Sequence, residues 1–208
     1  SVNGEAVSLA LTDDSIPGVP AQSYYAVKTY EDGDKVNITA AAEGMKAVSS
    51  ATVVPSRFPL TSINFVLKGG EPNQLQFWIH FTDNAQTKDY YALKVERKRQ
   101  FWNDSKYSVE NSSLTLNLDD EPLLNTSSGL DDILMIENEF YRNLYYWDDT
   151  KIQGKSYKVR LNTNYEADYE DDFITPDGVE HIKCQVKYRI SLYSLSEEFY
   201  RYLKSLND

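Results

Sequence analysis

Apolar and polar residues alternate along several stretches of this chain. The alternation covers residues 75–81, 91–95, 157–161 and 182–192, with an apolar side chain at every second position. A period of two places successive side chains on opposite faces of a β-strand, so each stretch is predicted to form a strand with one buried face. The longest stretch turns these side chains inward: Ile182, Cys184, Val186, Tyr188, Ile190 and Leu192.

Turn-forming sequences separate the predicted strands. Gly, Pro, Asn and Asp gather at residues 31–34, 68–73, 82–85, 153–155 and 175–178. Such clusters favour the tight turns that join antiparallel neighbours. The predicted fold class is therefore mostly β, with two antiparallel β-sandwich or barrel-like domains and one C-terminal α-helix packed on the second.

The first part of the chain contains shorter candidate strands, near residues 6–11, 24–30, 36–42 and 48–54. After Pro59 the strands lengthen and aromatic residues become more frequent, which favours a domain boundary at residues 56–60. We therefore expect an N-terminal Ig-like β domain at residues 1–58, truncated at its start, and a larger β domain at residues 59–208.

A helix is predicted at the C-terminus. Apolar side chains recur there at helical spacing, and their stripe is predicted to pack on a sheet: Phe199, Tyr202, Leu203 and Leu206. Ser194 together with Glu197 has the spacing of a capping box, so the helix is predicted to begin just after Ser194.

The net charge of the chain limits the classes of molecule that it is expected to bind. Its 208 residues carry a formal net charge of −11, which repels nucleic-acid backbones and anionic membrane surfaces, so we predict no nucleic-acid partner. No apolar run approaches the roughly 20 residues of a membrane-spanning helix. The single cysteine, Cys184, cannot form an internal disulfide and is predicted to be a buried free thiol.

Motifs for catalysis or cofactor binding are missing from the sequence. His80 and His181 take the outward side of their strands, and neither has the spacing of a zinc ligand. No serine-nucleophile motif and no phosphate-binding loop is present. We therefore predict that the chain is not an enzyme and uses no cofactor.

Acidic residues leave two alternatives open. Adjacent carboxylates occur at residues 119–121, 131–132, 148–149 and 170–172, and a two-carboxylate hydrolase would need two acids to converge in a cleft. Neighbouring acids point to opposite sides of a strand, so solvated loops are the favoured interpretation. The dense stretch at residues 166–172 could instead supply oxygen ligands to calcium.

One polar strand face suggests a binding site. Gln76, Trp78 and His80 share the outward side of the strand at residues 75–81, next to Gln74. A large aromatic ring beside amide groups is a common way for a β protein to present a binding face, so these three residues are predicted to bind a ligand. The alternative is that another sheet or the C-terminal helix covers this face.

Three motifs in a fixed order resemble a known family. They are Asp89-Tyr90-Tyr91-Ala92-Leu93, then Asp148-Asp149 followed by Gly154-Lys155, and the terminal strand that runs into Leu195-Ser196-Glu197 and on to Leu203. Together they resemble the Bacteroidetes lipoprotein family known as domain of unknown function forty-two forty-nine. Asp89 stands where the family often has asparagine, and Ile152 where it often has phenylalanine.

The resemblance implies a cellular location but no enzymatic activity. Such lipoproteins are extracytoplasmic, lie at the outer membrane or cell surface through a lipid anchor, and are often encoded beside a TonB-dependent receptor. We expect the anchor to be absent from this chain. We therefore expect a surface binding or accessory protein for nutrient uptake, with a glycan or peptide as ligand. A structural or adhesive surface protein is the alternative, and the family supplies no catalytic residues to carry over.

Overall fold

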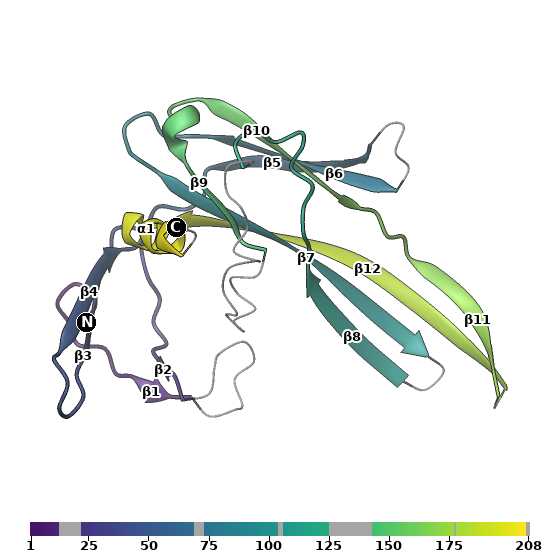
Figure 1. Ribbon diagram of the computed structural model, residues 1–208, viewed down its shortest axis with the longest axis horizontal. Coiled ribbons are helices and arrows are strands. Elements are labelled where there is room, and N and C mark those ends of the chain that lie inside the picture. The colour runs from purple at the N-terminus through teal and green to yellow at the C-terminus, as the bar shows by residue number, and fades with distance from the viewer. Residues whose placement is uncertain (13–21, 69–72, 104–105, 125–142, 177, 207–208) are drawn as a thin grey trace.

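The computed structural model describes residues 1–12, 22–68, 73–103, 106–124, 143–176 and 178–206 (Figure 1). The fold is mostly β with one C-terminal helix, as predicted, and its antiparallel sheets are open rather than closed into a barrel. In chain order the elements are β1 (Ala10–Leu11), β2 (Tyr24–Tyr25), β3 (Lys35–Ala40), β4 (Val48–Val53), β5 (Leu60–Leu67), β6 (Gln74–Thr82), β7 (Tyr90–Asn103), β8 (Lys106–Ser113), β9 (Tyr145–Asp148), the 3-10 helix η1 (Asp149–Lys151), β10 (Ser156–Asn164), β11 (Tyr169–Thr175), β12 (Gly178–Leu195) and α1 (Glu197–Ser205).

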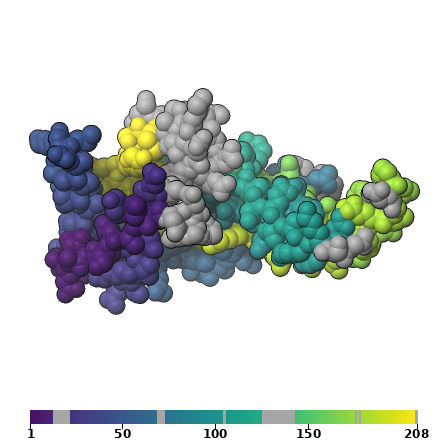
Figure 2. All heavy atoms as spheres, turned by 90° about the horizontal axis from the view of Figure 1, so that it is seen from below, coloured from purple at the N-terminus to yellow at the C-terminus, as the bar shows by residue number. Residues whose placement is uncertain are grey.

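Two sheets form the body of the molecule. A three-stranded sheet in the order β10-β6-β5 lies over a five-stranded sheet in the order β11-β12-β7-β8, and β9 pairs with the first residues of β7 (Figure 1). Beyond the body, the far ends of β7 and β12 continue with β8 and β11 into an arm, which Figures 1 and 2 show projecting from the rest of the protein.

The main core lies between these two sheets. The inward residues of β6 and β10 meet those of β7 and β9, and the most deeply buried members include Ile79, Phe81, Leu93, Val95, Val159 and Leu161. Phe58 adds a ring that packs on Phe81 and Tyr91 at centroid distances of 5.1 Å. The alternation of apolar residues therefore predicted the inner faces of these strands.

The register of β12 also agrees with the prediction. Cys184 is fully buried, whereas His181, Lys183 and Lys187 are exposed on the opposite side of the strand. Burial raises the pKa of the Cys184 thiol, so this cysteine stays in its protonated, unreactive form at neutral pH.

The N-terminal part forms two separate two-stranded sheets, β1-β2 and β3-β4. The end of β4 reaches the C-terminal helix, where the Thr52 hydroxyl donates a hydrogen bond to Glu198 over 3.0 Å. The division of the chain into an Ig-like domain at residues 1–58 and a second domain at residues 59–208 stays a prediction.

Helix α1 lies on the outer side of the five-stranded sheet, opposite the main core (Figure 1). Its N-cap is Ser196, whose hydroxyl accepts from the Phe199 backbone N–H, so the predicted cap at Ser194 is wrong. Ser194 still belongs to β12, where it pairs with Tyr91. None of the helices in the described part of the chain is long and apolar enough to cross a membrane.

The buried stripe of α1 also differs from the prediction at one residue. Leu203 is fully buried and Phe199 and Leu206 pack beside it, as expected. Tyr202, however, is exposed, and Tyr200 packs in its place with its ring centroid 4.7 Å from that of Tyr90. The helix is therefore rotated relative to the prediction, so that Tyr200 rather than Tyr202 packs on the aromatic side chains of β7 and β9.

We expect Leu203→Ala to lower the free energy of unfolding by about 2–5 kcal/mol, because the change leaves a cavity in a well-packed cluster. Denaturant unfolding would measure the loss. Tyr202→Ala on the exposed side of the same helix is the matched control and should change stability by no more than about 0.5 kcal/mol. Equal effects of the two substitutions would show that α1 does not dock through Leu203.

Candidate functional site

The predicted binding residues lie together on the outer face of the three-stranded sheet. The Trp78 indole N–H donates to Oε1 of Gln76 over 2.5 Å. The Gln76 amide in turn donates to Asn162 over 2.8 Å and to Asp120 over 3.2 Å. Gln76 is only 9% exposed, because these polar partners cover it. Gln76 is thus covered by Asn162 of the neighbouring strand β10 and by Asp120 from the segment after β8, and not by a second sheet or α1.

Trp78 and His80 are both half-buried. The Lys158 ammonium lies 4.6 Å from the Trp78 ring centroid, so a cation already stacks on this indole. His80 pairs across the sheet with Ser62 on one side and Lys158 on the other. The three predicted residues therefore share one face, and their role in ligand binding stays a prediction.

A polar pocket of about 340 Å³ opens beside this face. It is lined from β6, β7, β10 and the segment after β8 by Gln74, Arg97, Leu114, Thr115, Leu116, Asn117, Asn162, Thr163 and Asn164. Asn162 links the two regions, because its side chain accepts the hydrogen bond from Gln76. Two buried polar atoms of the lining, Oε1 of Gln74 and Nε of Arg97, have no hydrogen-bond partner among the described residues.

An ion-pair network holds Arg97 at this pocket. Nη1 of Arg97 lies 2.7 Å from Glu166, and Arg99 makes two further hydrogen bonds to the same carboxylate. The hydrogen bonds from Arg99 lower the pKa of Glu166, so the carboxylate stays charged. The backbone N–H of Glu166 also donates to the Tyr188 hydroxyl over 3.0 Å.

The acidic stretch at residues 166–172 is therefore divided among separate partners. Asp168 accepts from the backbone N–H of Val186, and Glu170 and Asp172 both contact His181. No group of metal ligands includes this stretch among the described residues, where the only such group lies elsewhere. The alternative of a calcium site at residues 166–172 is therefore not supported by a cluster of carboxylates among the described residues.

The converging acids are Asp83, Asp89 and Asp149, whose carboxylate oxygens lie within 4.8 Å of one another. The Lys88 ammonium contacts Asp149 and lies 3.3 Å from Asp148, so the cluster already contains a cation. The other oxygens accept hydrogen bonds: Asp83 from the Tyr91 hydroxyl over 2.7 Å and Asp149 from a backbone N–H over 2.8 Å.

This cluster ties the β6–β7 loop to the turn before β10. The second oxygen of Asp83 accepts from the backbone N–H of Gly154 over 2.8 Å. Gly154 has a φ of +66°, and a Cβ at this position would lie 2.7 Å from the Cβ of Ala85. Only glycine fits this close approach, so the motif that contains Gly154 has a structural reason.

Several acids predicted to be solvated are in fact buried. Asp149 and Glu121 are almost inaccessible. The Glu121 carboxylate accepts from the Tyr157 hydroxyl and from the backbone N–H of Arg160, each over 2.8 Å, and so satisfies the edge of β10. Sequence reasoning missed these roles because the partners lie far away in the chain. The run at residues 131–132 lies outside the described residues.

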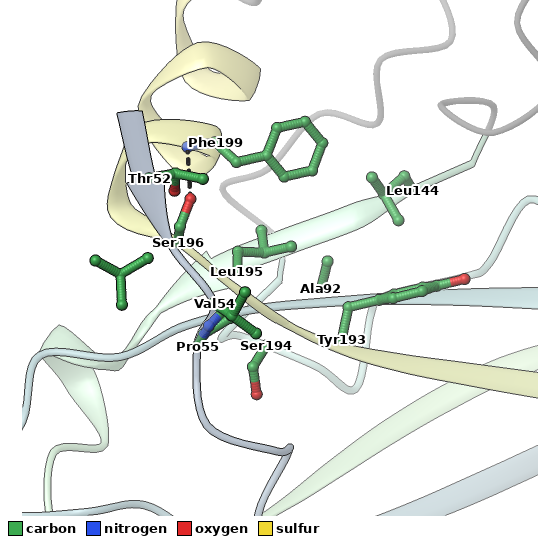
Figure 3. Close-up of a pocket in the computed structure, with 11 residues that line it drawn as sticks. Thr52, Val54, Pro55, Ala92, Leu144, Tyr193, Ser194, Leu195, Ser196 and Phe199 are labelled. Atoms are coloured by element: carbon green, nitrogen blue, oxygen red, sulfur yellow. Dashed lines mark hydrogen bonds between the residues drawn. The ribbon is translucent and has the colours of Figure 1, made fainter. Parts of the chain in front are cut away.

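A second pocket, of about 330 Å³, lies between the end of β4, helix α1 and the end of β12 (Figure 3). Its walls are mostly apolar and include Val54, Pro55, Leu144, Leu195 and Phe199. Figure 3 shows Ser196 turned toward the helix N-terminus, where its hydroxyl is already used as the cap. This pocket therefore offers packing surface but few polar groups that could orient a ligand.

We expect Asp83→Ala to destabilise the fold, because it leaves the buried Tyr91 hydroxyl and the Gly154 N–H without an acceptor. Each orphaned donor costs about 1–3 kcal/mol. Denaturant unfolding would measure the change. Asp83→Asn keeps one acceptor oxygen and should lose less stability; if both variants matched the parent chain, the cluster would not hold the two loops together.

The tip of the arm contains a histidine between two carboxylates. Nδ1 of His181 lies 2.6 Å from Asp172 and Nε2 lies 3.0 Å from Glu170. The hydrogen bond to Asp172, followed by that to Glu170, raises the pKa of His181. His181 and Lys183 lower the pKa of Glu170.

Because the folded pKa of His181 is raised, the charged imidazole stabilises the tip fully below the ordinary pKa of about 6.5, and this contribution disappears as the pH rises through the raised value. Protonation of Glu170 removes the same contribution at acid pH. An NMR titration of the His181 ring should give a midpoint above about 6.5. In the Glu170→Gln/Asp172→Asn variant the midpoint should fall; an unchanged midpoint would contradict the ion pairs.

One comparison with known proteins assigns this chain to a family. None of the curated proteins matches this chain. A family model described as a domain of unknown function, DUF4249, matches residues 2–208. This match spans nearly the whole sequence, including the strand that begins at Tyr90, the turn at Gly154 and the terminal helix. The chain therefore belongs to the DUF4249 family.

Proposed function

We propose that this protein is a binding or accessory lipoprotein of the cell envelope, which presents a nutrient ligand to a TonB-dependent receptor. The observation that carries the proposal is the polar pocket at Gln74 and Arg97. A concave site with a few converging polar groups is the usual form of a ligand-binding site. The ligand we propose is a short glycan or a peptide, since both carry many neutral donors and acceptors.

The two unpaired atoms of the pocket support binding of a polar ligand. Oε1 of Gln74 is an acceptor and Nε of Arg97 is a donor, and both are buried. A buried polar atom without a partner costs about 1–3 kcal/mol, so a ligand that satisfies both atoms recovers this free energy. Hydroxyl and amide groups can do so, because each donates and accepts.

The pocket is also held ready for a ligand. Glu166 fixes the Arg97 guanidinium, and Arg99 holds Glu166 from the other side. Preorganised side chains lose less entropy when a ligand binds. On the neighbouring face, Gln76 and Trp78 extend the polar surface through Asn162, so a ligand longer than the pocket can continue along β6.

The lining favours binding over catalysis. Arg97 is the single titratable side chain among the described lining residues, and the carboxylate that it contacts, Glu166, is kept charged by Arg99. General acid–base catalysis needs a group that gains and loses a proton near neutral pH, which arginine does not. The acids that do converge, at Asp83 and Asp149, are engaged by Lys88, Tyr91 and backbone donors.

A structural or adhesive role is the second candidate, and one surface favours it. Edge strand β5 turns Ile63, Phe65 and Leu67 toward the core side of its sheet, yet Phe65 is 70% exposed. An exposed apolar row on a free sheet edge is typical of a surface that meets another protein. The growth assay below separates this role from uptake.

The test is calorimetric titration of the chain with neutral oligosaccharides and short peptides. We expect one class to bind, and Gln74→Met, which keeps the size of the side chain but removes its amide, to weaken binding by about tenfold. Gln153→Met, at an exposed position of the turn before β10, is the matched control. A strain without this protein should then grow poorly on the bound compound. Equal binding by the Gln74 variant, or normal growth, would refute the proposal.

A further inference from the structure

The arm carries a surface that is separate from the pocket. We call it the cationic face. It belongs to the side of β7 and β12 that also packs on α1. It covers residues Glu96 to Trp102 of β7 and Lys183 to Arg189 of β12. The unbroken register of these two strands places the even residues of β7 opposite the odd residues of β12 on this side. Figure 2 views the molecule from below, and the arm extends clear of the body.

The cationic face brings like charges together. Lys98 and Lys187 are directly opposite each other across the two strands, and Arg189 follows Lys187 on the same side. Like charges in such a pair repel and destabilise a sheet. No acidic side chain in the described parts of the chain makes an ion pair with these three cations, although the chain carries a net charge of −11.

The acidic side chains on this face already contact other cations. Glu96 is the cross-strand neighbour of Arg189 and lies 4.0 Å from the Lys94 ammonium, and Glu170 contacts both His181 and Lys183. Asp172 contacts His181. From β8 the face receives uncharged side chains, which are Tyr107, Val109, Asn111 and Ser113. Lys98 and Lys187 therefore remain an exposed cation pair that an external anion would neutralise.

Amide and aromatic groups follow the cation pair along the arm. Gln100 and Gln185 form the next cross-strand pair, and Trp102 and Tyr107 form the one after, with ring centroids 5.4 Å apart. Trp102 and Tyr107 are 36% and 51% exposed. The Gln100 amide donates to the Tyr107 hydroxyl over 2.7 Å, while its Oε1 has no partner among the described residues.

We propose that the cationic face binds an anionic glycan, in which sugar rings carry carboxylates or sulfates. The exposed Trp102 and Tyr107 rings stack on the apolar face of a sugar ring, the glutamines bond its hydroxyls, and Lys98 and Lys187 neutralise its acidic groups. Four residues of an extended strand separate Lys98 from Trp102, or about 13 Å, which is the span of a short oligosaccharide.

The combination of groups favours a glycan over other polyanions. A phosphate surface, whether of a membrane or of a nucleic acid, offers mainly acceptors, which would leave Oε1 of Gln100 unpaired. An acidic peptide supplies the charge but no ring with a flat apolar side next to hydroxyl donors. This proposal goes beyond the pocket, since it concerns a different face of the molecule and a charged class of ligand.

The experiment titrates the full chain with polygalacturonate, dextran sulfate and, as the uncharged match, carboxyl-reduced polygalacturonate. At least one anionic polymer should bind, with an affinity that falls as salt is added. The neutral polymer should bind about tenfold more weakly or not at all, since exposed charge pairs each contribute modestly. The two anionic polymers distinguish a carboxylate ligand from a sulfate ligand.

Variants assign the binding to this face. Lys98→Gln/Lys187→Gln should weaken binding by about tenfold, and Trp102→Ala should weaken it further. Lys35→Gln/Lys46→Gln removes the same charge from exposed positions near the N-terminus and should have no effect. The lysine substitutions relieve repulsion, so thermal unfolding should show a folded protein at least as stable as the parent.

Several results would overturn the proposal. These are the absence of binding to either anionic polymer, equal binding to the neutral polymer, or equal loss from the control pair of lysines. Binding of phosphatidylglycerol vesicles or oligothymidylate through Lys98 and Trp102, without glycan binding, would assign the face to another polyanion. Gln74→Met should leave polymer binding unchanged; loss in that variant would place the polymer in the pocket instead.

Discussion

The continuous pairing of β7 with β12 is the constraint on which the rest of this structure depends. Its register runs without a break from Asn103 and Ile182 to Tyr90 and Leu195. Because side chains alternate, one face of this pair supplies the lower wall of the main core, and the other face receives α1. A shift of one residue would exchange the two faces, so both hydrophobic clusters fix the same register.

Buried and half-buried carboxylates are the second element of the architecture, and they connect segments that are distant in the chain. Glu121 accepts a hydrogen bond from a backbone N–H at the edge of β10. Glu166 forms ion pairs with Arg97 and Arg99 where the arm leaves the body. Each carboxylate meets several donors, which offsets the cost of removing its charge from water. Both of these carboxylates lie at junctions between elements of the described structure.

The sequence was sufficient to predict β6, β10, parts of β7 and β12 with their inner faces, and the terminal helix, because these follow from local periodicity. Strands β5, β8, β9 and β11 lack a clear alternation and were not predicted. It could not predict that Gln76 would be covered, since Asp120 and Asn162 reach it from distant segments. The cap at Ser196 and the packing of Tyr200 depend on where β12 ends and on how the helix turns against the sheet. Asp83, Asp89 and Asp149 come from two turns, and only the pairing of β7 with β9 brings them together.

The length of β12 sets how far the tip of the arm lies from the C-terminal helix. Its 18 residues form one extended strand that spans about 60 Å, from the turn at Gly178 to the cap of α1. Its two neighbouring strands, β11 and β7, hold it extended through hydrogen bonds along its length. A group at the tip of the arm is therefore separated from α1 by most of the length of this strand, and the two ends of β12 share no neighbouring surface.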